Sequence, residues 1–100
     1  MNEYILFMHD DVLEPTIAND ENLWGQYIAE LQASGQFDGG SAIGDGMVFK
    51  KNCAASSAPM TVTGYIRVRA ENIDAARRFL IRNPTYEAGG TVEVRELQRT

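Results

Sequence analysis

The sequence predicts an α+β fold of the ferredoxin-like type, in the βαββαβ order of dimeric α–β barrels. Three observations predict it: an apolar strand near the start of the chain, an alternating strand at 61–70, and a helical segment after each of them. A chain of 100 residues has room for one domain, so 1–100 is expected to fold as a single unit.

The first strand is expected from Glu3 to His9, where apolar residues stand at odd and even positions alike. A strand with two apolar sides is usually covered on both faces of its sheet. A helix is then expected at 20–34, capped by the Asp20 carboxylate and ended by Gly35 in the left-handed conformation. Its buried face consists of Trp24, Tyr27, Ile28 and Leu31.

In the middle of the chain the signals for secondary structure are weaker. A strand at 36–43 is interrupted by Gly39 and Gly40, which favours a β-bulge. A short strand at 47–49 is expected to run back after a glycine turn. The small and polar residues at 50–59 indicate a mobile loop.

The second half repeats the strand-helix-strand order. Aliphatic and polar residues alternate through 61–70, which makes this the clearest strand of the chain. A second helix is expected to start at Asn72, which caps it, and to end before Pro84. A last strand is expected at 91–97.

This element order places both helices on one face of the sheet and leaves the other face bare. An apolar sheet face exposed to water is an aggregation hazard. We therefore expect a two-fold homodimer that stacks the two sheets and encloses a cleft.

The chain is acidic, with 14 acidic and nine basic residues and a net charge of −5. A duplex-binding surface needs clustered cations, so no nucleic-acid partner is expected. All nine basic residues lie in 50–100, whereas 1–49 contains nine acidic residues and no lysine or arginine. Two interpretations stay open: the two halves interleave in one sheet, or a pocket collects the arginines and holds an anion.

No apolar run approaches the roughly 18 residues of a membrane-spanning helix, so no membrane partner is expected. The acidic start of the chain is unlike a secretory signal. Cys53 is the only cysteine, which excludes an internal disulfide and favours a cytoplasmic protein. It lies in a loop of small residues and is interpreted as an idle thiol.

His9 is the only histidine and is followed by Asp10 and Asp11. It is either a general base at the end of a strand or a polar residue where that strand meets water. Together with Glu14 these residues lack the ligand spacing of a metal site. The glycine pairs do not fit a phosphate-binding loop, so neither a metal nor a cofactor is expected.

Tyr65 and Arg67 share the face of their strand that points away from the helices, so they are expected to face the cleft. A buried arginine needs a partner, and two are open: Glu93 across the sheet, or an anionic ligand held by the guanidinium group. Trp24 and Tyr27 either wall the same pocket or belong to the core.

The chain resembles the YCII-related, or DGPF-domain, family over most of its length. The resemblance is carried by Gly64–Val68 (GYIRV), Asn72–Ala76 (NIDAA), Asn83–Gly89 (NPTYEAG) and Val92–Arg95 (VEVR), and Trp24–Gly40 is similar to the family's first helix and its exit. It implies a dimeric α–β barrel of the ferredoxin-like type, with a ligand cleft between the sheets.

Relatives in the YCII branch that act as enzymes rely on a histidine from the first helix and an aspartate before the proline after the second. This sequence has Trp24 and Asn83 at those positions, and neither side chain moves a proton near neutral pH. The resemblance therefore does not extend to this pair, and catalysis is not expected from it. The DGPF signature is also absent, because the corresponding loop at 55–60 reads ASSAPM, although tryptophan in the first helix is typical of that branch.

The sequence thus predicts a small homodimer that binds a small anionic or aromatic molecule. The cleft residues are expected to be Trp24, Tyr27, Tyr65, Arg67 and Asn83, with His9 near the mouth. One alternative is an enzyme that uses His9 as the base and Arg67 to hold negative charge on a small acidic or aromatic substrate. The other is a regulatory protein-binding module that uses the sheet edge or the 50–59 loop.

Overall fold

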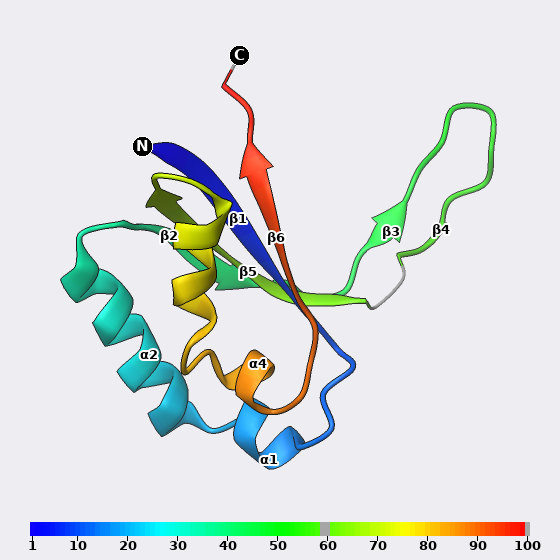
Figure 1. Ribbon diagram of the computed structural model, residues 1–100. Helices are drawn as coiled ribbons and strands as arrows, with labels where there is room; N and C mark the ends of the chain where they lie inside the picture. Colours follow the sequence, from blue (N-terminus) through cyan, green and yellow to red (C-terminus); the bar gives the residue numbers. More distant parts are fainter. Residues whose placement is uncertain (59–60, 100) are drawn as a thin grey trace.

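The computed structural model describes residues 1–58 and 61–99, and its main layer is a four-stranded antiparallel sheet in the order β2-β5-β1-β6 (Figure 1). The strands are β1 (Asn2–His9), β2 (Phe37–Ala42), β5 (Val62–Ala70) and β6 (Val92–Leu97). Helical segments connect β1 to β2 and β5 to β6, which is the ferredoxin-like arrangement. The predicted α+β fold class is confirmed.

The long helix α2 (Glu21–Ser34) forms where the sequence predicts it. The Asp20 carboxylate accepts hydrogen bonds from the backbone N–H groups of Asn22 and Leu23, and Gly35 ends the helix at φ 71°. A short helix, α1 (Pro15–Ala18), precedes it and was not predicted. Among the described residues, no helix combines the length and the apolar character that a membrane span requires.

The expected single helix after Asn72 is wrong in its extent. A first turn, α3 (Ile73–Ala76), tightens into the 3-10 helix η1 (Arg77–Leu80), and a separate helix α4 (Pro84–Glu87) follows. Arg82 between them takes a left-handed conformation with φ 66°, and the residue before Pro84 is extended, as a following proline favours. The segment before this turn is short, and short helix ends commonly tighten to 3-10 geometry.

The core lies between these helices and one face of the sheet. Alternate residues of β1 and β5 are at most 4% exposed: Tyr4, Leu6, Met8, Ile66, Val68 and Ala70. They form one cluster with Tyr27 and Leu31 of α2 and Ala76 of α3. Strict alternation along β1 therefore decides which face the helices cover.

Among the described residues, no helix covers the other face of the sheet. The helix residues of the core cluster pack on the face that carries Tyr4, Leu6 and Met8. In the strand register, Phe7 lies between Tyr65 and Glu93, and Ile5 between Arg67 and Arg95. We call this surface the open face, consisting of Ile5, Phe7, His9, Tyr65, Arg67, Glu93, Arg95 and Leu97. Its apolar members are half-buried in the single chain.

Ion pairs join the acidic first half of the chain to the basic second half. Arg69 Nε lies 3.1 Å from Asp38 Oδ2, and Arg99 Nε lies 3.5 Å from Glu3 Oε2. Arg82 pairs with Glu30 in the same way. These ion pairs join acidic residues of 1–49 to arginines of 50–100, as expected if the two halves interleave in one sheet.

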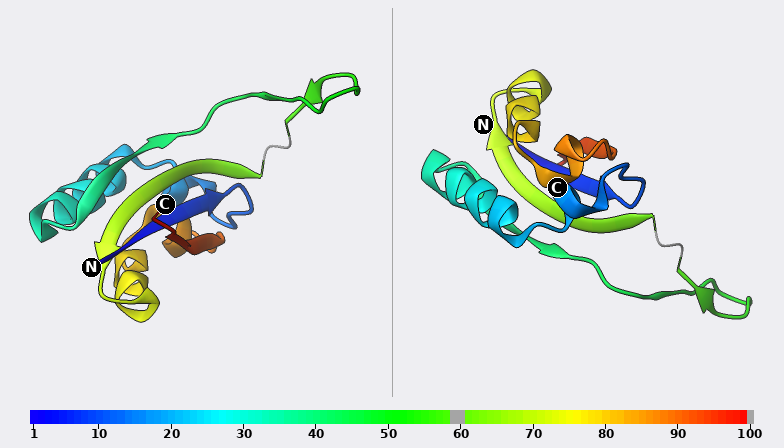
Figure 2. Two further views of the ribbon diagram at one scale, coloured as in Figure 1. Left: turned by 90° about the horizontal axis from the view of Figure 1, so that it is seen from above. Right: turned by 90° about the horizontal axis from the view of Figure 1, so that it is seen from below.

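A long hairpin leaves the sheet between β2 and β5 and extends away from the body (Figures 1 and 2). Its two short strands, β3 (Met47–Val48) and β4 (Ser56–Ser57), pair with each other and form a separate two-stranded sheet. The strand expected at 47–49 is present in this position. Residues 59 and 60, which end the expected loops at 50–59 and 55–60, lie outside the described residues.

The loop after β1 is fixed to the start of β6 through Asp11. Its carboxylate accepts hydrogen bonds from the backbone N–H of Thr91 at 2.7 Å and from the Thr91 hydroxyl at 2.5 Å. These bonds hold the pKa of Asp11 below its ordinary value, and the bond from the Thr91 hydroxyl has the largest effect. A lowered folded pKa gives stability that is present above the unfolded pKa and is lost as the pH falls through the folded one.

Thr91→Ala is expected to raise the pKa of Asp11 towards its ordinary value, because it removes the hydroxyl donor. The measurement is an NMR titration of the Asp11 carboxyl carbon. Thr91→Ser keeps the hydroxyl and should leave the pKa closer to that of the unaltered protein. An Asp11 pKa that is the same in Thr91→Ala and the unaltered protein would contradict this account of the loop.

Candidate functional site

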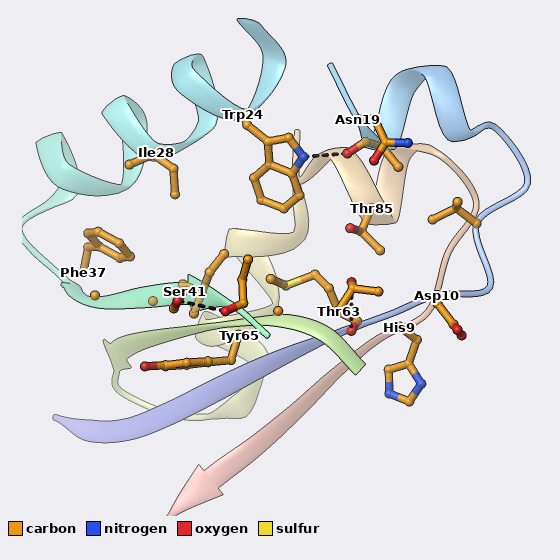
Figure 3. A pocket seen from close by; sticks show the side chains of 18 residues that line it. His9, Asp10, Asn19, Trp24, Ile28, Phe37, Ser41, Thr63, Tyr65 and Thr85 are labelled. Carbon is orange, nitrogen blue, oxygen red and sulfur yellow. Dashed lines mark hydrogen bonds between the residues drawn. The ribbon is translucent and has the colours of Figure 1, made fainter. Parts of the chain in front are cut away.

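A cavity of about 830 Å³ lies between α2 and the sheet (Figure 3). This volume falls within the range of about 300–1,000 Å³ that is typical of small-molecule sites. Trp24 and Ile28 of α2 form one wall, and Phe37 at the start of β2 closes one end. The cavity therefore occupies the helix-facing side of the sheet.

Small residues create this space. Four small residues line the sheet side of the cavity: Gly39, Gly40, Ala42 and Gly64. Because they have little or no side chain, space remains opposite the indole of Trp24. At Gly40 a Cβ atom would lie 2.3 Å from the backbone oxygen of Tyr65, so only glycine permits this close approach of β2 to β5. The register shift between Phe37 and Gly40 is the predicted bulge.

Trp24 is held rigidly in the wall. Its indole Nε1 donates a hydrogen bond to the backbone oxygen of Ala18 at 2.6 Å. Its ring packs edge-to-face on Tyr27, with centroids 5.9 Å apart and an interplanar angle of 75°. Because the N–H group is already used, Trp24 offers the cavity a flat apolar surface, and Figure 3 shows the ring directed into it.

Few polar groups in the cavity are free to bind a ligand. The hydroxyls of Ser41 and Thr63 donate to the backbone oxygens of Ala42 and Met8. Among the described residues, no side-chain hydrogen bond engages the amide of Asn19 or the hydroxyl of Thr85. The described lining contains no lysine or arginine, and its one carboxylate is that of Asp10.

Tyr65 and His9 border the cavity, but Figure 3 shows that their side chains point to the opposite side of the strands from Trp24. His9 Nε2 lies 3.1 Å from Glu93 Oε1, and Glu93 Oε2 lies 3.2 Å from Arg95 Nη1. The imidazole is 26% exposed. His9 therefore belongs to a chain of three polar side chains on the open face, next to the cavity rim.

Tyr27 and Asn83 lie in the protein interior behind the Trp24 wall. Tyr27 is 2% exposed and its hydroxyl donates to the backbone oxygen of Phe79. Burial raises the pKa of Tyr27 to about 12. Asn83 is fully buried and caps α4, accepting a hydrogen bond from the Tyr86 N–H at 3.1 Å. These positions support the core and the turn before α4.

Arg67 lies outside the cavity, on the open face. It donates to the backbone oxygen of Asp38 at 2.8 Å, while Glu93 pairs with His9 and Arg95. In the strand register Arg67 stands opposite Ile5. At about 3.3 Å per residue, this places it roughly 13 Å along the sheet from His9. The structure does not bring the expected anion-binding arginine and the expected base together.

Of the residues predicted for the cleft, the structure thus gathers Trp24 in the wall and Tyr65 and His9 at the margin. Sequence reasoning missed Ile28, Phe37 and Thr85 as cavity residues, although it placed Ile28 on the correct helix face. Alternation shows which residues face the helices, but it does not show where packing leaves a gap. The run of small residues at 39–42 was the available signal.

No protein-family profile matches the sequence, and no curated protein matches it. Among solved structures, the chain is similar to 5-chloro-2-hydroxyhydroquinone dehydrochlorinase from Burkholderia phenoliruptrix AC1100 in complex with 2,5-dihydroxybenzoquinone. The TM-score is 0.60 at 13% sequence identity, over 98% of this chain and 95% of that one. The likeness supports the ferredoxin-like α+β fold and, at this identity, concerns the fold alone.

Tyr27→Phe is expected to lower the free energy of unfolding by about 1–2 kcal/mol, because it leaves the Phe79 carbonyl without its donor. A raised folded pKa gives stability that is present below the unfolded pKa near 10 and is lost as the pH rises towards about 12. Tyr27→Phe should reduce this alkaline loss. Urea unfolding between pH 7 and pH 11.5 measures both effects, and identical pH profiles for the two proteins would contradict the assignment.

Proposed function

We propose that this chain is a homodimeric small-molecule-binding protein, and that the cavity between α2 and the sheet holds a neutral or weakly acidic planar ring. The cavity itself is the observation that carries the proposal. Its volume fits such a ligand, and its Trp24 wall is fixed by a hydrogen bond at the indole nitrogen. A rigid wall costs little side-chain entropy when a ligand binds.

The lining chemistry selects the ligand class. Trp24, Ile28 and Phe37 offer apolar and aromatic surface, which favours a flat ring. No described lining residue is a lysine or arginine, so the site does not favour a fully charged anion. The free amide of Asn19 and the hydroxyl of Thr85 suit a hydroxyl or carbonyl group on the ring.

The solved neighbour supports the same class. It is described as a complex with 2,5-dihydroxybenzoquinone, which is a planar ring that carries hydroxyl and carbonyl groups. We propose that this chain, which resembles the YCII-related and DGPF-domain family, takes a planar ring of similar size that stays uncharged at neutral pH. With Trp24 and Asn83 at the positions of the family's acid–base pair, the proposed role is binding, in a cytoplasmic setting.

The dimer of this proposal forms through the open face. Ile5, Phe7, Tyr65 and Leu97 place apolar surface there, and no helix among the described residues covers it. A second copy that stacks part of its own open face on this one removes apolar surface of both copies from water and leaves the rest of each open face free for further contacts. Such a dimer leaves the ligand cavity on the far side of each sheet.

A second candidate function is catalysis, and one observation favours it. When Nε2 of His9 donates its proton to Glu93, Nδ1 is left as a proton acceptor. Arg95 bonds the other oxygen of the same carboxylate and helps to fix its orientation. This is the positioning that a general base requires.

The binding proposal is tested with the Cys53→Ser protein, because quinones react with exposed thiols. Substituted hydroquinones, which are uncharged at neutral pH and oxidise slowly to such quinones, are expected to quench the fluorescence of Trp24, the only tryptophan. They should also raise the melting temperature, since a ligand at 100 times its Kd stabilises the folded state by about 2.7 kcal/mol. Benzoate, an anion of similar size, should bind at least tenfold more weakly.

Two phenylalanine variants on α2 provide the control. Ile28→Phe places a larger ring in the space beside Trp24 and should weaken quenching and stabilisation at least tenfold, whereas Leu23→Phe adds the same ring at a position 38% exposed outside the cavity and should leave both intact. An equal loss of binding in both variants would overturn the proposed site. So would the absence of quenching and of a raised melting temperature with every ring compound in the protein with the unaltered cavity.

The catalytic candidate predicts a particular tautomer. At pH 8 the His9 ring should carry its proton on Nε2, and Glu93→Gln should weaken that preference, because it removes the carboxylate acceptor. Nitrogen-15 NMR distinguishes the two tautomers directly. A His9 ring protonated on Nδ1 in the unaltered protein would contradict this candidate and leave the binding proposal standing.

A further inference from the structure

The hairpin between β2 and β5 is the least buried part of the described chain. We call residues 43–58 the arm. Every residue from 40 to 57 is exposed. Four large apolar side chains are among them: Ile43 is 38%, Met47 58%, Val48 43% and Phe49 79% exposed. Within 1–58 and 61–99, the strands β3 and β4 pair only with each other.

An isolated arm of this kind is physically unfavourable. A single two-stranded hairpin is marginally stable in water, and it usually needs a further strand or a packed face. The arm also enlarges the molecule: the radius of gyration is 14.8 Å, against about 13 Å for a compact chain of this length. Its apolar side chains therefore require a surface that the body of the same chain does not provide.

We propose that the arm packs on a second copy of this chain, with its apolar side chains lying against the part of that copy's open face that the stacked sheets leave uncovered. The inference rests on the homodimer of the proposed function and adds the segment that clasps it. Two-fold symmetry makes the contact reciprocal, so each copy gives one arm and receives one.

Two uncovered apolar surfaces in one chain favour a second copy as the occupant. The arm presents Met47 and Phe49, and the open face presents Ile5 and Phe7. All views show the arm extending away from the body (Figures 1 and 2). Contact between copies lets these surfaces cover each other without refolding the chain.

The charges complement each other as well. The chain's only two lysines, Lys50 and Lys51, stand near the tip of the arm. Asp45 is the one acidic residue of the arm, which contains no arginine. The arm is thus net positive while the rest of the chain is net negative. At long range this difference in sign speeds the encounter of an arm with a second body. The open face itself carries Arg67 and Arg95 against Glu93, so apolar contact supplies the affinity there.

The test compares Phe49→Ser in the arm with Leu13→Ser in the body. The two side chains are equally exposed, at 79% and 80%, so the variants remove similar apolar surface from different places. Sedimentation equilibrium should show a dimer for the unaltered chain. Phe49→Ser is expected to weaken dimerisation at least tenfold, and Leu13→Ser to change it less than twofold. Circular dichroism checks that both variants keep the fold.

Cys53 supplies an independent readout, because the only cysteine of the chain lies in the arm and is exposed. A nitroxide attached there should be immobilised in the dimer, and it should become mobile on dilution or in Phe49→Ser. The label reports on the arm directly, so it remains informative even where dimer affinity changes little.

The outcomes separate the arm from the dimer itself. A dimer whose affinity is unchanged by Phe49→Ser, with a mobile label, overturns the arm contact and leaves the homodimer standing. A monomer at every concentration overturns both, while ligand binding in the cavity is judged by its own experiment. An immobilised label in a monomer shows the arm folded on its own chain and also overturns the inference.

Discussion

The alternation of side chains along β1 is the constraint on which the rest of the structure depends. Tyr4, Leu6 and Met8 are buried against the helices, and this fixes Ile5 and Phe7 on the other side of the sheet. A shift of one residue would exchange the two sets. The helix-covered face, the open face and the cavity therefore all follow from the register of this single strand with β5 and β6.

The cavity lies where the packing of α2 on the sheet is incomplete. Opposite Trp24 the sheet offers glycine and alanine, so α2 cannot fill the space that larger residues fill elsewhere along its length. The close approach of β2 to β5 at Gly40 keeps that position small. The hollow is thus built into the strand geometry, and its rigid aromatic wall gives it the character of a preformed site.

The elements that the sequence predicted well are those with a strong periodic or capping signal. Asp20 and Gly35 delimit α2, and the alternation of 62–70 identifies β5. The break at Arg82 was not predictable, since a left-handed arginine has no marker in the sequence. The location of the cavity was not predictable either, because Tyr27 and Trp24 show the same helical spacing and only three-dimensional packing separates core from wall.

The central claim is that the ligand lies between α2 and the sheet, within one chain. The most direct measurement is a crystal structure, or an intermolecular NOE map, of the protein with a bound substituted hydroquinone. The account predicts a ring against Trp24 and Phe37, with its oxygens near Asn19 or Thr85. A ring found between two open faces, against Phe7 and Tyr65, would contradict it.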